Sequence, residues 1–317
     1  MTELSVVLVN YNGATVLPRT LHALAENTQA EQVECIVVDS GSTDESWRSV
    51  EGEWDKARAL RLEENVGFSA GCNRGVEKAA GRLVAFVNFD GEVEPGWDAP
   101  LTALLDDSSV AVATGVLLSS DGATVEAAGL EIAPNMATFG RLEGTPRVSL
   151  PTRPFDVTAA SGALMMVRRE DFRALGGFYE PIFMYGEEAD YCLRANGRVV
   201  VDPRSAIRHE VGHAAGPPRS PLRLYYGSRN RLINAARHLP GSVLAKSIAA
   251  SAAFDALTLA QRRDRAATGA VARGWLDGLR ELRLQRSVMP PAARRAAGQK
   301  LTSVREAIAQ QRRLGRL

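Results

Sequence analysis

The chain has 317 residues, 45% of them hydrophobic and 24% charged, and it contains three cysteines. This composition is typical of a globular protein with a large core, and three scattered cysteines exclude a disulfide framework or a cysteine-based zinc site. The net charge of +1 conceals a division, because residues 217–317 carry 20 Lys and Arg against 5 Asp and Glu, whereas residues 1–216 carry 18 against 32. We therefore expect an acidic domain at residues 1–216 and a basic, mostly helical extension at residues 217–317.

The N-terminus enters a strand pattern at Leu4 without a basic, cleavable leader. No charge-free run of 18 apolar residues follows, so the sequence predicts no membrane span. Together with the unpaired cysteines, these features indicate a cytoplasmic protein.

Short apolar runs alternate with helical periodicity along the first part of the chain. Strands are predicted at residues 4–10, 34–39, 59–62, 83–88 and 110–116. Helices are predicted after four of these strands, at residues 17–24, 42–54, 73–79 and from 97 onward. Further along, residues 159–167 predict a strand preceded by small residues, and residues 187–194 predict a helix. This alternation predicts an α/β fold with a doubly wound, mostly parallel sheet.

Two of the predicted strands end in a carboxylate, Asp39 and Asp90. Open α/β sheets bind ligands at the carboxyl ends of their strands, so this pair suggests an enzyme that handles a nucleotide and a metal. The sequence does not fit a redox dinucleotide-binding domain. Such a domain has a Gly-x-Gly-x-x-Gly turn after its first strand, whereas this turn has a single glycine, Gly13. A P-loop motif is also absent from the sequence.

Five short motifs follow one another along the chain: Val9-Asn10-Tyr11-Asn12, Val38-Asp39-Ser40-Gly41-Ser42-Thr43-Asp44, Asn65-Val66-Gly67-Phe68, Asn88-Phe89-Asp90 and Tyr185-Gly186-Glu187-Glu188-Ala189-Asp190. Their order resembles that of family 2 glycosyltransferases, and the chain is similar to the bacterial rhamnosyltransferase-like branch over residues 3–240. The resemblance implies a GT-A fold with a C-terminal helical extension, a nucleoside-diphosphate-sugar donor of the dTDP or UDP type, a divalent cation (Mg²⁺ or Mn²⁺), and inversion at the anomeric carbon.

The resemblance assigns the nucleotide base to Asp39, whose carboxylate would accept hydrogen bonds from a pyrimidine ring. The alternative is that Asp39 caps the following helix. Other donor-binding residues are expected beside it at the strand ends and in a later segment: Asn10, Tyr11, Asn12, Asn65, Gly67, Asn73, Asn88 and Arg229. The alternative for Gly67 is a tight turn whose neighbouring Phe68 packs in the core.

Asp90 is the expected metal carboxylate, because Mg²⁺ and Mn²⁺ prefer oxygen ligands. The family's Asp-x-Asp motif is Asn88-Phe89-Asp90 here, so the motif supplies one anionic ligand instead of two. The resemblance places a metal-binding histidine at His209, with His213 as the nearby alternative.

The acidic cluster that opens the helix at residue 187 offers a general base, which would remove the proton of the attacking acceptor hydroxyl. The family usually has Asp where this chain has Glu188; we expect Glu188 to be the base, with Glu187 as the alternative. Capping of the helix by these acids is the structural alternative. Asp190, Ser161 and Gly162 are expected on the acceptor side, with Asp190 also able to pair with Arg194 four residues on.

The basic extension includes helical stretches at residues 243–261 and 274–284. These helices could contact the inner face of a membrane peripherally, or they could pack against the acidic domain or a second subunit. Nucleic-acid binding is not expected, because the sequence has no recognised binding motif.

The predicted function is a metal-dependent, inverting hexosyltransferase of polysaccharide or cell-wall biosynthesis. It would move rhamnose or another deoxyhexose to a saccharide or lipid-linked acceptor. Two alternatives stay open: a sugar nucleotidyltransferase, and a non-catalytic protein that binds sugar nucleotides.

Overall fold

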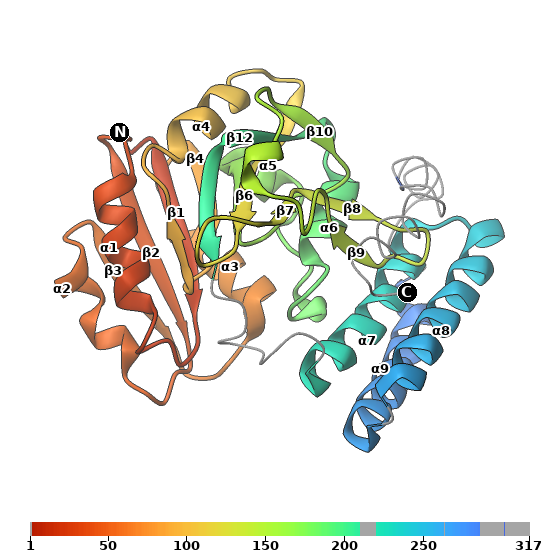
Figure 1. Ribbon diagram of the computed structural model, residues 1–317. Helices are drawn as coiled ribbons and strands as arrows, with labels where there is room; N and C mark the ends of the chain where they lie inside the picture. Colours follow the sequence, from red (N-terminus) through yellow and green to blue (C-terminus); the bar gives the residue numbers. More distant parts are fainter. Residues whose placement is uncertain (1, 210–219, 263, 286–300, 302–317) are drawn as a thin grey trace.

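The computed structural model describes residues 2–209, 220–262, 264–285 and 301 (Figure 1). The strands are β1 (Leu4–Asn10), β2 (Val33–Ser40), β3 (Ala57–Leu62), β4 (Leu83–Val87), β5 (Gly91–Val93), β6 (Val110–Leu118), β7 (Val125–Ala128), β8 (Leu130–Ile132), β9 (Thr138–Gly140), β10 (Phe155–Val157), β11 (Leu164–Arg168) and β12 (Arg198–His209). Ten of these form one sheet with the order β10-β12-β6-β11-β4-β1-β2-β3, in which β5 joins β12 and β7 joins β6.

The central strands are long apolar runs buried on both faces, as expected for a parallel sheet covered by helices. Every residue of β1, β4 and β6 is buried. β1 pairs in parallel with β2 and β4, and β12 pairs in parallel with β6, whereas β11 lies antiparallel between β4 and β6. The predicted α/β fold with a mostly parallel sheet is confirmed.

Helices cover both faces of the sheet. They are α1 (Leu17–Asn27), α2 (Val50–Glu53), α3 (Gly67–Lys78), α4 (Asp98–Leu105), α5 (Arg169–Ala174), α6 (Glu187–Arg194), α7 (Pro221–His238), α8 (Gly241–Arg262) and α9 (Arg265–Gln285), with short 3₁₀ turns at Ser46–Ser49, Arg147–Ser149 and Glu180–Ile182. Because side chains alternate along a strand, Leu8 packs with α1 and α4 on one face, while Val7 packs with α3, α5 and α6 on the other.

Helices α7, α8 and α9 pack against one another at the end of the molecule opposite α1 and α2 (Figure 1). Asn230 of α7 donates hydrogen bonds to the backbone carbonyls of Ile182, Met184 and Tyr185. These bonds tie α7 to the segment that precedes α6. The predicted division at residue 216 lies outside the described residues and stays a prediction, but contacts from α7 cross it.

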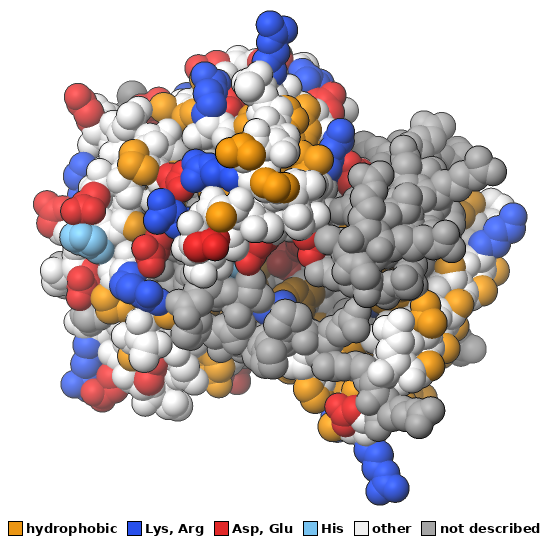
Figure 2. Space-filling model, viewed as in Figure 1, with side chains coloured by type: hydrophobic (Ala, Val, Ile, Leu, Met, Phe, Trp, Pro, Cys, Tyr) orange, Lys and Arg blue, Asp and Glu red, His pale blue; other side chains and the backbone are white. Residues whose placement is uncertain are grey.

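Helix α8 contains a stretch, Gly241–Gln261, that is long and apolar enough to cross a membrane by length and composition, and 22% of it is buried. The sequence did not predict this because Lys246 and Asp255 interrupt the apolar run. Large hydrophobic side chains are exposed on the helical part, including Leu257 of α8 and Leu276 of α9, and Figure 2 shows hydrophobic side chains along its outer edge.

Candidate active site

A cavity of about 500 Å³ opens at the carboxyl ends of β1, β2 and β4 and is closed on the other side by residues 183–188 and the start of α7. Ten of the sixteen residues predicted for the site line it: Tyr11, Asn65, Gly67, Asn88, Asp90, Ser161, Gly162, Glu187, Glu188 and His209. The other six lie behind its wall or away from it: Asn10, Asn12, Asp39, Asn73, Asp190 and Arg229. The parallel sheet therefore brings most of the predicted site to one edge.

Asp39 and Asn10 form a buried pair behind the nucleotide end of the cavity. They are register partners on β2 and β1, and both side chains are fully buried. Asn10 Nδ2 donates to Asp39 Oδ1 at 2.8 Å and to Ser46 Oγ at 2.7 Å, while the backbone N–H of Ser42 donates to Asp39 Oδ2 at 3.2 Å. Asp39 thus shapes the loop after β2 and does not cap the following helical turn at Ser46–Ser49, whereas the neighbouring Tyr11 lines the cavity.

Asn12 joins the loop after β1 to the loop after β2, because its Oδ1 accepts a hydrogen bond from the backbone N–H of Thr43 at 2.8 Å. On the next loop, Asn65 Oδ1 accepts from the backbone N–H of Gly67 at 2.9 Å. Gly67 has φ +81° and a Cβ there would lie 2.6 Å from the ring of Phe183. Only glycine fits this close approach without strain.

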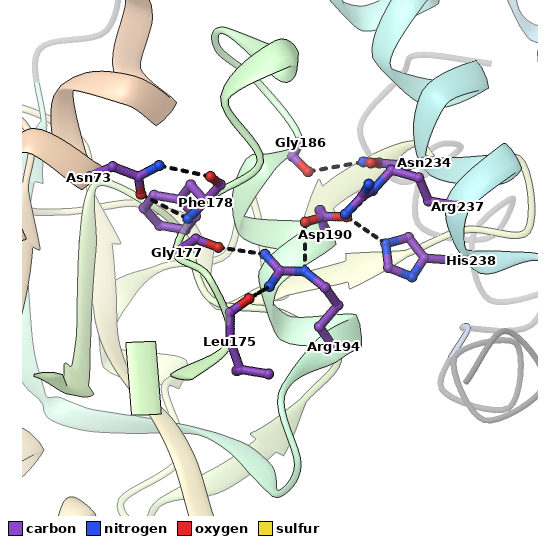
Figure 3. A network of polar contacts seen from close by, with 10 residues as sticks. All are labelled: Asn73, Leu175, Gly177, Phe178, Gly186, Asp190, Arg194, Asn234, Arg237 and His238. Atoms are coloured by element: carbon purple, nitrogen blue, oxygen red, sulfur yellow. Dashed lines mark hydrogen bonds and ion pairs between the residues drawn. The ribbon is translucent and has the colours of Figure 1, made fainter. Parts of the chain in front are cut away.

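The Asn73 side chain is occupied by the backbone of Phe178: its Nδ2 donates to the Phe178 carbonyl and its Oδ1 accepts from the Phe178 N–H, both at 2.9 Å (Figure 3). Arg229 donates to the carbonyl of Pro181 at 2.8 Å. Both side chains therefore brace the wall of the cavity, and neither lines it.

Asn88, Asp90 and His209 meet at the middle of the cavity. The pairing of β5 with β12 sets His209 opposite Gly91, next to Asp90. His209 Nε2 lies 3.2 Å from Asp90 Oδ1 and 3.1 Å from Asn88 Nδ2. Burial alone would lower the pKa of His209, but the adjacent carboxylates of Asp90 and Glu126 outweigh it and raise the pKa to about 9.

These residues fit a divalent cation that also takes ligands from a substrate. Asp90 Oδ1 is buried and makes no well-aligned hydrogen bond, although His209 Nε2 lies 3.2 Å away, so this oxygen can take a cation as its partner. Within the described residues no group of three His, Cys, Asp or Glu side chains is arranged to hold a metal ion, so one carboxylate and one imidazole need further ligands. His213, the alternative histidine, lies outside the described residues.

Glu187 and Glu188 begin α6 and are buried, at 4% and 9% exposure. The Gly186 N–H donates to Glu188 Oε2 at 3.1 Å, whereas Glu187 Oε2 has no hydrogen-bond partner. Burial raises the pKa of Glu187 well above its usual range, and the charge of Glu188 adds to this. Burial also raises the pKa of Glu188, but contact with Glu187 and the Gly186 N–H offset part of the increase. The pair therefore takes up a proton more readily than exposed carboxylates do.

Asp190 does not line the cavity. It lies in a buried cluster that joins α6 to α7 (Figure 3). Its Oδ2 accepts from Arg194 Nε at 2.9 Å, and its Oδ1 accepts from Arg237 Nε at 2.7 Å and His238 Nε2 at 2.8 Å. Burial would raise the pKa of Asp190, but the hydrogen bond from His238 and the surrounding positive charges hold it well below its usual range. The pairing with Arg194 is confirmed, and an acceptor contact by Asp190 is not supported.

Sequence reasoning gave no site role to two residues of α7 that line the cavity, Arg223 and Tyr226. Arg223 and Tyr226 reach it from the first turns of α7, and the Arg223 guanidinium lies 5.4 Å from the centre of the Tyr185 ring. The rings of Phe183 and Tyr226 are stacked at 5.2 Å. The spacing of Arg223 and Tyr226 is helical, but no sequence signal showed which face of α7 the cavity uses.

Comparison with known proteins places this geometry in a family. The profile of glycosyl transferase family 2 matches residues 5–176, which is more than half of the chain. The N-acetylglucosaminyl-diphospho-decaprenol L-rhamnosyltransferase of Mycobacterium tuberculosis is 28% identical over 261 residues, covering 72% of this chain and 83% of the relative. The chain spans less than two thirds of the length of several other curated relatives that it matches.

Two solved structures show the same fold. Staphylococcus aureus TarS 1-349 in complex with UDP-GlcNAc has a TM-score of 0.59 at 16% identity, covering 99% of this chain and 92% of that one. The mannosyltransferase PcManGT from Pyrobaculum calidifontis, in complex with GDP-Man and Mn²⁺, has a TM-score of 0.55 at 17% identity, covering 94% and 86%. The predicted GT-A fold is confirmed, and with the profile match to residues 5–176 the chain belongs to glycosyl transferase family 2.

Proposed function

We propose that the chain is an inverting glycosyltransferase that moves a hexosyl group from a nucleoside-diphosphate sugar to a hydroxyl of an acceptor. The observation that carries this proposal is that one cavity holds both Asp90 with His209 and the buried pair Glu187 and Glu188. The first pair faces a leaving diphosphate, and the second faces an attacking hydroxyl. Family membership supports the reaction class.

The donor lies with its base at the ends of β1 and β2 and its diphosphate at Asp90 and His209. Tyr11, Asn65 and Gly67 line the first part of this path. We propose a dTDP or UDP donor that carries rhamnose or another deoxyhexose. The rhamnosyltransferase of M. tuberculosis, at 28% identity, supports the sugar, and the UDP-GlcNAc complex of TarS supports a uridine nucleotide.

Glu188 is the general base of this proposal. As the acceptor oxygen forms its bond to the anomeric carbon, the hydroxyl proton passes to Glu188 and the bond to the nucleoside diphosphate breaks. A base must be ionised before it accepts a proton, and burial raises the pKa of the adjacent Glu187 well above its usual range, so that Glu187 can carry a proton of its own. Glu187 then lies beside the base as a neutral acid and does not compete with it for the proton.

Asp90 and His209 would hold a divalent cation, Mg²⁺ or Mn²⁺, with the Asn88 amide beside them. When bound, the cation neutralises the leaving diphosphate as a Lewis acid. The unsatisfied Asp90 Oδ1 supports this assignment, as does the Mn²⁺ in the PcManGT complex for the fold.

The acceptor is a saccharide, free or linked to a lipid, that enters past Ser161 and Gly162.

We also propose that the basic helices α8 and α9 touch the inner face of a membrane, a contact supported by the exposed Leu257 and Leu276. Co-sedimentation of the full chain with anionic phospholipid vesicles tests this contact. A chain that stays in solution at low salt contradicts it.

Turnover with defined donors tests the proposed function. The full chain is incubated with UDP-glucose, UDP-GlcNAc, GDP-mannose or dTDP-rhamnose, with Mn²⁺ and a GlcNAc-diphosphoryl lipid as acceptor, and the released nucleoside diphosphate is measured. We expect acceptor-dependent release with one pyrimidine donor. Tight nucleotide binding without release by any donor would favour the non-catalytic alternative.

A further inference from the structure

Glu126 lies beside His209, which with Asp90 forms the proposed metal site, and the proposed function gives Glu126 no role. It belongs to β7, and its Oε2 is 3.5 Å from Nδ1 of His209, the ring nitrogen that faces away from Asp90. That nitrogen is buried and completes no hydrogen bond. Within the described part of the chain, no Lys or Arg pairs with Glu126.

A β-bulge places this carboxylate. β7 pairs antiparallel with β6, with Leu117 opposite Ala127 and Leu118 opposite Val125. Glu126 is therefore the extra residue between two successive pairs. Bulges re-aim a side chain and occur often next to active sites, and this one directs Glu126 to the ring of a histidine on β12.

Such a carboxylate would offset the neutral first residue of the motif, Asn88. An Asn at position 88 leaves the carboxylate of Asp90 as the single anion that the motif supplies. A histidine that binds a metal through Nε2 keeps its proton on Nδ1, and a carboxylate that accepts this proton fixes the ring and makes Nε2 a stronger ligand. Glu126 lies on the side of the ring where that acceptor is required.

We propose that Glu126 is a positioning residue of the metal site, which accepts the Nδ1–H of His209 and supplies the negative charge that Asn88 does not. The inference rests on the proposed function, because it assumes that Asp90 and His209 hold a divalent cation. Glu126 does not line the cavity and touches neither donor nor acceptor. Its effect passes through His209.

Binding of Mn²⁺ to the full chain, followed by the electron paramagnetic resonance signal of the free ion, tests the inference without any turnover. Glu126→Gln should weaken Mn²⁺ binding about 10–100-fold, the usual cost of losing a carboxylate behind a histidine ligand. The matched control is Glu92→Gln, on β5 near the same site, since Glu92 is half exposed and pairs with Arg19. The control should bind Mn²⁺ as the wild type does.

An Asn88→Asp background, which places a second carboxylate in the motif, tests whether Glu126 compensates for the neutral Asn88. If Glu126 compensates for the neutral Asn88, then Glu126→Gln should cost much less Mn²⁺ affinity in an Asn88→Asp background than in the wild type. An equal loss in both backgrounds overturns the compensation. Equal affinity of Glu126→Gln and Glu92→Gln overturns the positioning role.

The protonation of the ring gives a second readout. Two-bond ¹H–¹⁵N spectra of the chain saturated with Mg²⁺ report which nitrogen of each histidine carries a proton, and His209→Ala assigns one of the four histidines. We expect an Nδ1–H on His209 in the wild type and a changed signal in Glu126→Gln. If the wild type binds no Mn²⁺ or Mg²⁺, the metal site of the proposed function fails as well. If the wild type binds the ion but Glu126→Gln changes neither the Mn²⁺ affinity nor the His209 signal, the positioning role of Glu126 fails and the metal site of the proposed function stands.

Discussion

Replacing Asp190 with asparagine should destabilise the fold strongly while leaving the cavity lining chemically unchanged. The side chain is 0% exposed and receives hydrogen bonds from Arg194, Arg237 and His238 at 2.7–2.9 Å. Asparagine keeps the shape but leaves the buried Arg237 and the partly buried Arg194 without their anion. Breaking a buried ion pair in this way costs about 3–5 kcal/mol. For a chain of 317 residues that corresponds to a fall in Tm of roughly 5–8 °C.

Urea unfolding followed by tryptophan fluorescence measures the loss, with Asp156→Asn as the control. Asp156 also pairs with an arginine, Arg198, but the side chains are 58% and 51% exposed, so the control should change stability by less than about 1 kcal/mol. The folded pKa of Asp190 is depressed, so its contribution is complete above the unfolded value near ~3.9 and disappears as the pH falls through the lower folded value. Equal stability of the two variants at pH 7 would refute the buried network as an anchor between α6 and α7.

Two further predictions concern the cavity. Arg223 lines the cavity, and we expect its guanidinium to pair with the diphosphate of UDP. Arg223→Ala should therefore weaken binding of UDP about 10-fold or more, because a charge-assisted hydrogen bond is worth about 1.5–3 kcal/mol. Arg229→Ala should lower the melting temperature instead; loss of UDP affinity in Arg229→Ala but not in Arg223→Ala, measured by titration calorimetry, would contradict this expectation. His209 has a raised folded pKa of about 9, so the stability that it gives the metal-free chain is complete below its unfolded pKa near ~6.5 and disappears as the pH rises through 9. Thermal unfolding with EDTA should show this fall between pH 6.5 and 9 in the wild type and not in His209→Ala; the same pH profile for both would rule out the charge pairing with Asp90 and Glu126.

The central strands were predictable because their sequences leave few alternatives. Leu4–Asn10 was predicted to the residue, and a run in which all seven side chains are buried fits only a strand covered on both faces. The helix expected at residues 42–54 is much shorter, a 3₁₀ turn at Ser46–Ser49 followed by α2. Asp44 bonds to the backbone of Ala14 and Ser46 instead of opening a long helix.

The chemistry of the site was more predictable than the direction of its side chains. Asp90 and Glu188 line the cavity as expected, because the ends of parallel strands and the start of α6 meet at one edge of the sheet. Asn73 and Arg229 fit the donor by residue type, yet the structure directs them to backbone carbonyls of the segment that closes the cavity. Sequence periodicity does not show which polar side chain satisfies a neighbouring carbonyl. Glu126 could not have been predicted either, because a bulge with no recognisable sequence signal aims it.

The turnover of Glu188→Gln, measured with the donor that the wild type uses, tests the central claim most directly. Glutamine keeps the size of the side chain and removes the proton acceptor, so the rate should fall about 10²–10⁴-fold while the affinity for UDP stays unchanged. Glu187→Gln imitates a protonated Glu187 and should retain most of the turnover. Wild-type turnover of Glu188→Gln, or a loss confined to Glu187→Gln, would contradict the assignment of Glu188 as the base.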